Sequence, residues 1–123
     1  MSSDHISQAI ETARRYVTEH PDDARSPDRP AVAVIERGLR CRAGGPGDAL
    51  LFTDMPAAVG GTNSAPTPGW LSRAAHASCD ATVIAMRAAE LGITLQRLEV
   101  TVDSGSDDRG LLGLDDIVPA GPL

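Results

Sequence analysis

A thiol and an imidazole lie three residues apart in this chain, at Cys79 and His76. Residues at this spacing share one face of a helix, and a positive imidazole beside a thiol favours the reactive thiolate. The pair therefore has the ingredients of redox chemistry at Cys79, although the neighbouring Asp80 opposes it with negative charge and position alone favours a structural cysteine. The alternative is structural: free cysteine is among the most buried residue types, and His76 would then bond to backbone or to a partner chain.

The segment that carries these residues, AAHASCDATVIAMRAAELGI at 74–93, is apolar on nearly every side. Pro68 suits the first turn of a helix and Gly92 suits the position just after its last residue, so we predict a helix over 68–91. A helix without a polar face has to be buried, and the chain offers few other elements to cover it. The sequence thus predicts a long, buried central helix.

The rest of the chain predicts short elements around this helix. Gly38 is expected as a bulge or bend in the first strand, and two strands are expected to form an antiparallel hairpin over 31–54. The order helix, strand, strand, helix, strand indicates the α+β class. The predicted elements besides the long helix are an amphipathic helix at 4–19, a polar linker at 20–30, strands at 31–42 and 49–54 joined by a turn at 44–48, and a further strand at 93–104.

The composition is that of one folded domain with an acidic balance. The chain has 123 residues, of which 41% are hydrophobic, and a formal net charge of −6 in which all 11 basic residues are arginine. An acidic chain without basic clusters argues against nucleic acid or an anionic membrane surface as a partner. No apolar run reaches the length of a membrane span and no signal peptide is visible, so we expect a cytoplasmic protein.

Two cysteines without a CxxC pair do not predict a zinc site, and two reduced thiols are the default. A disulfide between Cys41 and Cys79 would need their Cα atoms within about 7 Å, and an inert strand cysteine is the favoured interpretation of Cys41. The acidic stretch at 103–108 lacks the ligand spacing of a calcium loop, which favours a solvated turn. We therefore expect neither a metal nor a cofactor.

Five segments of the second half of the chain follow one another at characteristic spacing. They are TDMPAAVGG at 53–61, APTPGWL at 65–71, AAHASC at 74–79, AAELGITLQRLEVTV at 88–102 and DDRGLLGLDD at 107–116. Together they resemble the OsmC/Ohr superfamily, the osmotically inducible protein C-like and organic hydroperoxide resistance proteins. By this resemblance residues 31–123 form the OsmC-like domain and 1–30 precede it. Family members continue with a strand, a helix and a final strand, so we expect the C-terminal part to be missing here.

The resemblance implies an intertwined homodimer and a cysteine-based thiol peroxidase that reduces organic hydroperoxides in oxidative-stress defence. Cys79 would attack the peroxide, with His76 beside it and a dithiol as the final reductant. An arginine from the first strand region would stabilise the thiolate and the departing oxygen. Arg40 is the first choice and Arg42 the second, and surface charge on an edge strand is the alternative for either.

A second hypothesis is a redox-inactive module of the same fold that binds a partner or has a structural role. Peroxidases of the family carry a Glu at the start of the long helix, where this chain has Gly69 or Trp70. Their resolving cysteine belongs to a later helix that this sequence does not reach. A third interpretation is a truncated product that folds incompletely. The missing Glu favours the redox-inactive module, whereas Cys79 in the AAHASC motif favours the enzyme. The sequence therefore leaves these alternatives open.

Overall fold

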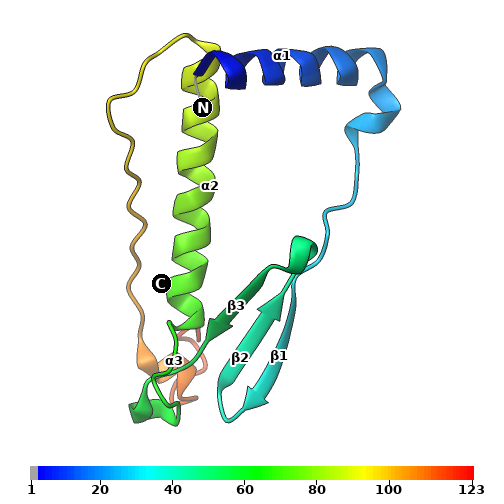
Figure 1. Ribbon diagram of the computed structural model, residues 1–123. Coiled ribbons are helices and arrows are strands. Elements are labelled where there is room, and N and C mark those ends of the chain that lie inside the picture. Colours follow the sequence, from blue (N-terminus) through cyan, green and yellow to red (C-terminus); the bar gives the residue numbers. More distant parts are fainter. Residues whose placement is uncertain (1–2) are drawn as a thin grey trace. The chain divides into compact units, whose positions relative to one another are not determined.

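The computed structural model describes residues 3–123 and confirms the α+β class (Figure 1). Two long helices and one antiparallel sheet make up most of its regular structure. The elements are α1 (Ser3–Glu19), β1 (Val32–Arg37), β2 (Arg40–Gly44), β3 (Leu50–Thr53), α2 (Pro68–Glu90) and α3 (Asp108–Leu111), with 3₁₀ turns at Pro21–Ala24, Pro46–Asp48 and Ala57–Val59.

The chain divides into two compact units, which we describe separately. The first unit combines Met1–Arg29 with Ala77–Val100, and the second combines Pro30–His76 with Thr101–Leu123. Helix α2 contributes its first nine residues to the second unit and the remainder to the first.

The ends of α2 lie where the sequence predicts them. Thr67 caps the helix, because its hydroxyl accepts the backbone N–H of Trp70 at 3.2 Å, and Pro68 is the first helical residue. At the other end Gly92 has φ +68°, and its N–H and that of the next residue donate to carbonyls of the last turn. This pair of bonds is a Schellman motif, which glycine forms without steric cost.

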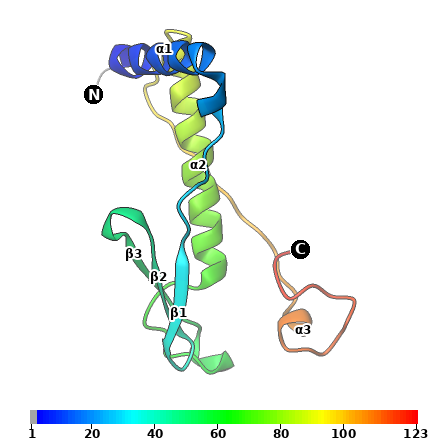
Figure 2. The same cartoon turned by 90° about the vertical axis from the view of Figure 1, so that its right-hand side faces the viewer.

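The sheet has three antiparallel strands in the order β1-β2-β3, one more than the predicted hairpin (Figure 2). The expectation of a single strand over 31–42 is wrong, because Gly38 (φ +53°) lies in a tight turn that separates β1 from β2. Arg37 pairs with Arg40 across this turn, and glycine supplies the positive φ that a two-residue hairpin turn requires. The predicted turn at 44–48 is confirmed, and it joins β2 to β3 through the 3₁₀ turn with Gly47 at φ +65°.

The further strand predicted at 93–104 is not a strand in the described chain. Its alternation of apolar and polar residues satisfies the pattern, but a strand also needs a neighbour that shares backbone hydrogen bonds. Within residues 3–123 the sheet consists of β1, β2 and β3 only, so this segment has no ladder to join. Helix α3 begins at the last residue of the acidic stretch at 103–108, and the Asp107 carboxylate caps it by accepting the N–H of Arg109.

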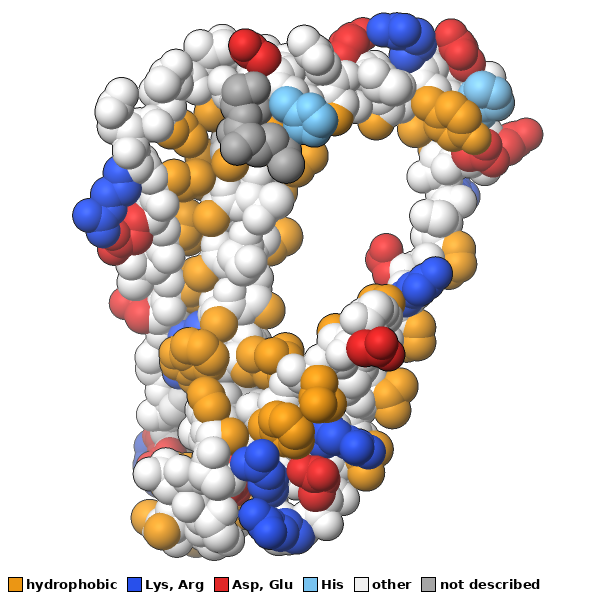
Figure 3. All heavy atoms as spheres, viewed as in Figure 1, with side chains coloured by type: hydrophobic (Ala, Val, Ile, Leu, Met, Phe, Trp, Pro, Cys, Tyr) orange, Lys and Arg blue, Asp and Glu red, His pale blue; other side chains and the backbone are white. Residues whose placement is uncertain are grey.

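The prediction that α2 is buried is also wrong for the single chain. Its only buried residues are Ala88 and Ala89. Figure 3 shows hydrophobic side chains at the surface along α2. Large apolar side chains of the helix are roughly half exposed, namely Val83, Ile84, Met86 and, just after its last turn, Leu91. Within one copy, the described residues therefore leave most of the apolar surface of α2 in water.

In the first unit, an ion pair joins α1 to the end of α2. The guanidinium of Arg14 donates to the carboxylate of Glu90, which also accepts from Arg87 one turn earlier at 2.9 Å. The bond from Arg87 and the positive charge of Arg14 lower the pKa of Glu90 below its ordinary value, against the effect of burial. This ion pair links α1 to the last turn of α2 by charge.

Candidate functional site

A buried carboxylate lies at the end of β3 in the second unit. Asp54 is 1% exposed, and its Oδ2 accepts hydrogen bonds of 2.6 Å from the hydroxyls of Ser64 and Thr62. The N–H of Met55 donates to Oδ1 at 2.8 Å, and the N–H of Ser64 donates to Oδ2 at 3.1 Å. The bonds from Ser64 and Thr62 hold the pKa of Asp54 well below its usual range, although burial opposes them. The carboxylate thus stays ionised and holds the loop together.

The loop that returns these hydroxyls to the carboxylate depends on glycine. A Cβ at Gly61 would lie 1.8 Å from the carbonyl oxygen of Met55, so no side chain fits there without a backbone shift. Gly60 (φ +97°) and Asn63 (φ +53°) occupy the left-handed region, which glycine and asparagine adopt at least cost. The sequence GGTN therefore folds back tightly enough for the loop to close on itself.

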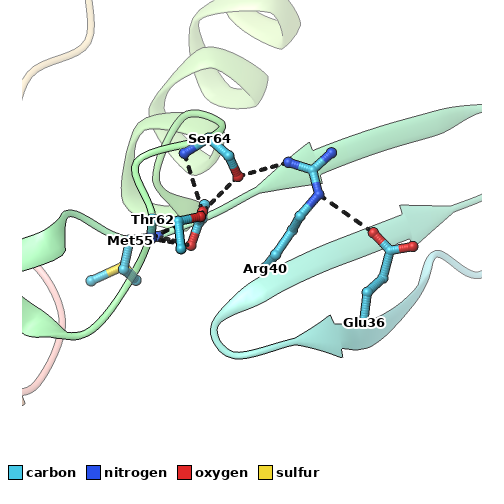
Figure 4. A network of polar contacts seen from close by, with 6 residues as sticks. Glu36, Arg40, Met55, Thr62 and Ser64 are labelled. Atoms are coloured by element: carbon cyan, nitrogen blue, oxygen red, sulfur yellow. Dashed lines mark hydrogen bonds and ion pairs between the residues drawn. The ribbon is translucent and has the colours of Figure 1, made fainter.

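Arg40 lies at the start of β2, and its guanidinium has three partners, of which Figure 4 shows Ser64 and Glu36. Nη1 donates to the hydroxyl of Ser64 at 2.8 Å, Nε lies 3.6 Å from a carboxylate oxygen of Glu36, and Cζ lies 4.5 Å from the centre of the Phe52 ring. Arg42, the second choice from the sequence, lies exposed on the same strand. The structure thus distinguishes the two arginines, because Arg40 is anchored in this network.

Asp54 and Ser64 are not among the site residues that the sequence predicts, although Asp54 belongs to a segment that carries the family resemblance and Ser64 directly precedes another. A signal was present, since Asp54 directly follows an apolar strand, where a carboxylate needs hydrogen-bond donors. The sequence does not show which residue donates to Asp54, because Ser64 is ten residues away along an irregular loop.

Cys79 is exposed and lies on α2 in the first unit. His76 precedes it by three residues on the same continuous helix, so the helical repeat puts both on one side, as the sequence predicts. The expectation of a thiol inside a buried helix is wrong for the single chain. Arg40 belongs to the second unit.

Cys41 is a half-buried free thiol in the middle strand of the sheet. It is in register with Ile35 on β1 and with Thr53 on β3. Because side chains alternate along a strand, Cys41 points to the side of the sheet opposite Arg42. Its neighbours across the ladder are uncharged, which is the environment of a structural cysteine.

The first turn of α2 contains Gly69 and Trp70 and has no acidic residue. Trp70 is 51% exposed. A groove of about 550 Å³ adjoins this turn in the second unit. Its lining is mostly apolar and includes Met55, Val59, Pro68, Arg73, Leu111 and Pro122. Neither Cys79 nor Arg40 lines this groove.

Neither a known protein-family model nor a curated protein matches the chain. Among residues 3–123 there is no group of three or more His, Cys, Asp or Glu side chains that could hold a metal ion. No helix in the described range is long and apolar enough to cross a membrane.

Proposed function

We propose that this protein is an OsmC-like thiol peroxidase that reduces organic hydroperoxides through Cys79. The observation that carries the proposal is the exposed Cys79 thiol on α2, one helical turn after His76. A thiol on a regular helix is held in a fixed position, and its exposure gives a hydroperoxide access to the sulfur. No metal or cofactor takes part in this chemistry.

In the reaction, the Cys79 thiolate attacks one oxygen of the hydroperoxide and the O–O bond breaks. The attacked oxygen stays on sulfur as a sulfenic acid, and the other leaves as an alcohol after taking up a proton. A dithiol then attacks the sulfenic acid and releases water. Its second thiol displaces Cys79 from the mixed disulfide, which leaves an oxidised dithiol and a reduced enzyme.

An external dithiol fits this chain better than an internal resolving thiol. The other cysteine, Cys41, lies in the middle strand of the sheet among uncharged neighbours. In the proposal Arg40 is the arginine that stabilises the departing oxygen, a role that requires a guanidinium held in a fixed orientation. Its contacts with Ser64, Glu36 and Phe52 support that assignment over Arg42.

The test is the oxidation of the intact protein by cumene hydroperoxide. We expect one added oxygen that maps to Cys79 within a brief treatment, and none there in Cys79→Ser. Cys41→Ser is the matched control, because it removes the other thiol and should leave the reaction unchanged. Equal and slow labelling of both cysteines would overturn the peroxidase proposal.

The second candidate is a redox-inactive module that binds a small apolar molecule. Two observations favour it: the first turn of α2 lacks the carboxylate of the family's peroxidases, and the apolar groove adjoins that turn. The rate in the oxidation experiment separates the two candidates, because the binding module predicts that Cys79, although exposed, oxidises only slowly, as an unactivated thiol does.

We further propose that the working form is a homodimer in which a second copy covers α2. Fully burying one Val, Leu or Ile side chain stabilises a protein by roughly 1.5–3 kcal/mol, and several such side chains of α2 are about half exposed. Light scattering across a dilution series is expected to show a dimer that dissociates at low concentration. A monodisperse monomer with a cooperative melt at all concentrations would exclude this assembly.

A further inference from the structure

The Ser64 hydroxyl is both an acceptor and a donor, because Arg40 donates to it and it donates to Asp54. Its Oγ donates to Asp54 Oδ2 at 2.6 Å and accepts from Arg40 Nη1 at 2.8 Å. A hydroxyl has one proton, and an ionised carboxylate only accepts, so the proton of Ser64 is committed to Asp54. A lone pair of Ser64 is therefore left for Arg40, and the carboxylate fixes the hydroxyl that orients the guanidinium.

Two further contacts fix the plane of the guanidinium. Phe52 lies against its face, with Cζ 4.5 Å from the ring centre, and the Glu36 carboxylate lies 3.6 Å from Nε. The cation–π contact with Phe52 and the ion pair with Glu36 together restrict the movement of the guanidinium. The Arg40 side chain is 22% exposed, and the described chain offers Nη2 no hydrogen-bond partner. Its N–H groups remain for a ligand.

We propose that Asp54 and Ser64 are positioning residues, which hold the guanidinium of Arg40 in the orientation that it needs during the reaction with hydroperoxide. This inference rests on the proposed peroxidase function. Neither residue touches the peroxide. Both act through Arg40, with Asp54 acting on Ser64 and Ser64 on the guanidinium.

Thr62 provides the control that separates positioning from loop stability. Its hydroxyl donates to the same Asp54 oxygen at the same 2.6 Å as Ser64, but Thr62 makes no contact with Arg40. Thr62→Val and Ser64→Ala therefore each remove one equivalent bond to the carboxylate. Only Ser64→Ala also removes the acceptor for Arg40.

The first measurement is the rate of Cys79 oxidation by cumene hydroperoxide. We expect Arg40→Ala to slow it about 10²-fold, as for the loss of one preorganised donor, and Ser64→Ala to slow it roughly tenfold. Ser64→Thr keeps the hydroxyl and should restore the rate, and Thr62→Val should leave it within about twofold. In the Arg40→Ala background, Ser64→Ala should have no further effect. Equal slowing by Ser64→Ala and Thr62→Val would overturn the inference.

The second measurement does not depend on activity. The Nε–Hε resonance of Arg40, assigned by its loss in Arg40→Ala, reports how the guanidinium is held. We expect Ser64→Ala to shift this resonance and speed its exchange with water, while Thr62→Val leaves it in place. An unreactive wild-type Cys79 with this pattern intact would overturn the peroxidase function but keep the positioning. An Arg40 resonance that Ser64→Ala does not move would overturn the positioning itself.

Discussion

The loop around Asp54 and the C-terminal part of α2 differ in how completely the single chain supplies their partners. The Asp54 carboxylate has its hydrogen-bond donors, whereas the apolar side chains of α2 are largely uncovered. In the Asp54 loop, residues 54–66, a carboxylate that is 1% exposed has four strong donors within ten residues. In the C-terminal part of α2, residues 77–90, only Ala88 and Ala89 are buried. Large apolar side chains there, such as Val83 (59% exposed), face water. The single chain therefore supplies the hydrogen-bond donors that the Asp54 carboxylate needs, but not the apolar surface that would cover α2.

The difference follows from the range of the two interactions. A hydrogen bond needs one partner atom at about 2.9 Å, which a short loop can supply. Burial of an apolar helix needs area from several elements on several sides. A short chain can therefore complete a polar site on its own, whereas α2 needs a surface that a second copy would provide in the proposed dimer.

The largest effect is expected for Gly61→Ala. The new Cβ would overlap the carbonyl oxygen of Met55, 1.8 Å away, and force the loop open. We expect a loss of about 3 kcal/mol in the free energy of unfolding, the upper end for overpacking, measured by urea denaturation. Gly105→Ala is the matched control, because nothing lies within 4 Å of a Cβ there. If the two substitutions have equal effects, the Asp54 loop is not the closely packed region described here.

The next effect tests the other side of the comparison. Ile84 is 45% exposed on α2, and in an uncovered helix Ile84→Ser should change stability by no more than about 0.5 kcal/mol. If a second copy covers the helix, the substitution should cost about 1.5–3 kcal/mol and shift the dimer toward monomer in light scattering. We expect the larger value. Ile117→Ser, at a side chain that is 93% exposed in a turn, should stay near zero.

The sequence predicted the parts of the fold that local chemistry decides. Pro68 and Gly92 set the ends of α2 by backbone geometry, and the 44–48 turn follows from its own glycines. Gly38 is predicted as a bulge or bend inside one strand and is the turn between two strands, because the sequence does not show the pairing beyond it. The segment at 93–104 failed for the same reason, because alternation shows which residues share a face and not which strand lies alongside.

For the candidate site, the sequence predicts the residues of α2 but not the hydrogen-bond network around Arg40. Cys79 and His76 were identified because one helix fixes their spacing. Arg40 could not be separated from Arg42, since both lie on one strand two residues apart and only the contact with Ser64 distinguishes them. Asp54 was missed because its role depends on how the loop closes, which no periodicity encodes.

A smaller effect is expected from acid, and it sharpens the description of the Asp54 loop. Because hydrogen bonds from Ser64 and Thr62 lower the pKa of Asp54 in the folded state, its contribution to stability is fully present above the unfolded pKa of about 4. It is lost as the pH falls from there toward the lower folded pKa. Asp54→Asn removes this titrating group. We therefore expect the free energy of unfolding of the variant to fall less steeply between about pH 4 and pH 2, by up to roughly the slope that one bound proton produces. Urea midpoints at several pH values measure this. Parallel curves for variant and wild type would contradict it.

The smallest effect is expected at the ion pair between α1 and α2. Arg14 is 55% exposed, and Glu90 keeps its second partner Arg87 when Arg14 is removed. Exposed pairs contribute little because water and salt screen them, so Arg14→Ala should lower the melting temperature by no more than a few degrees. High salt should remove even that difference. If Arg14→Ala proved as costly as Ile84→Ser, charge rather than apolar area would decide the stability of the first unit. The contrast between a satisfied polar loop and an unsatisfied apolar helix would then not explain how this chain is held together.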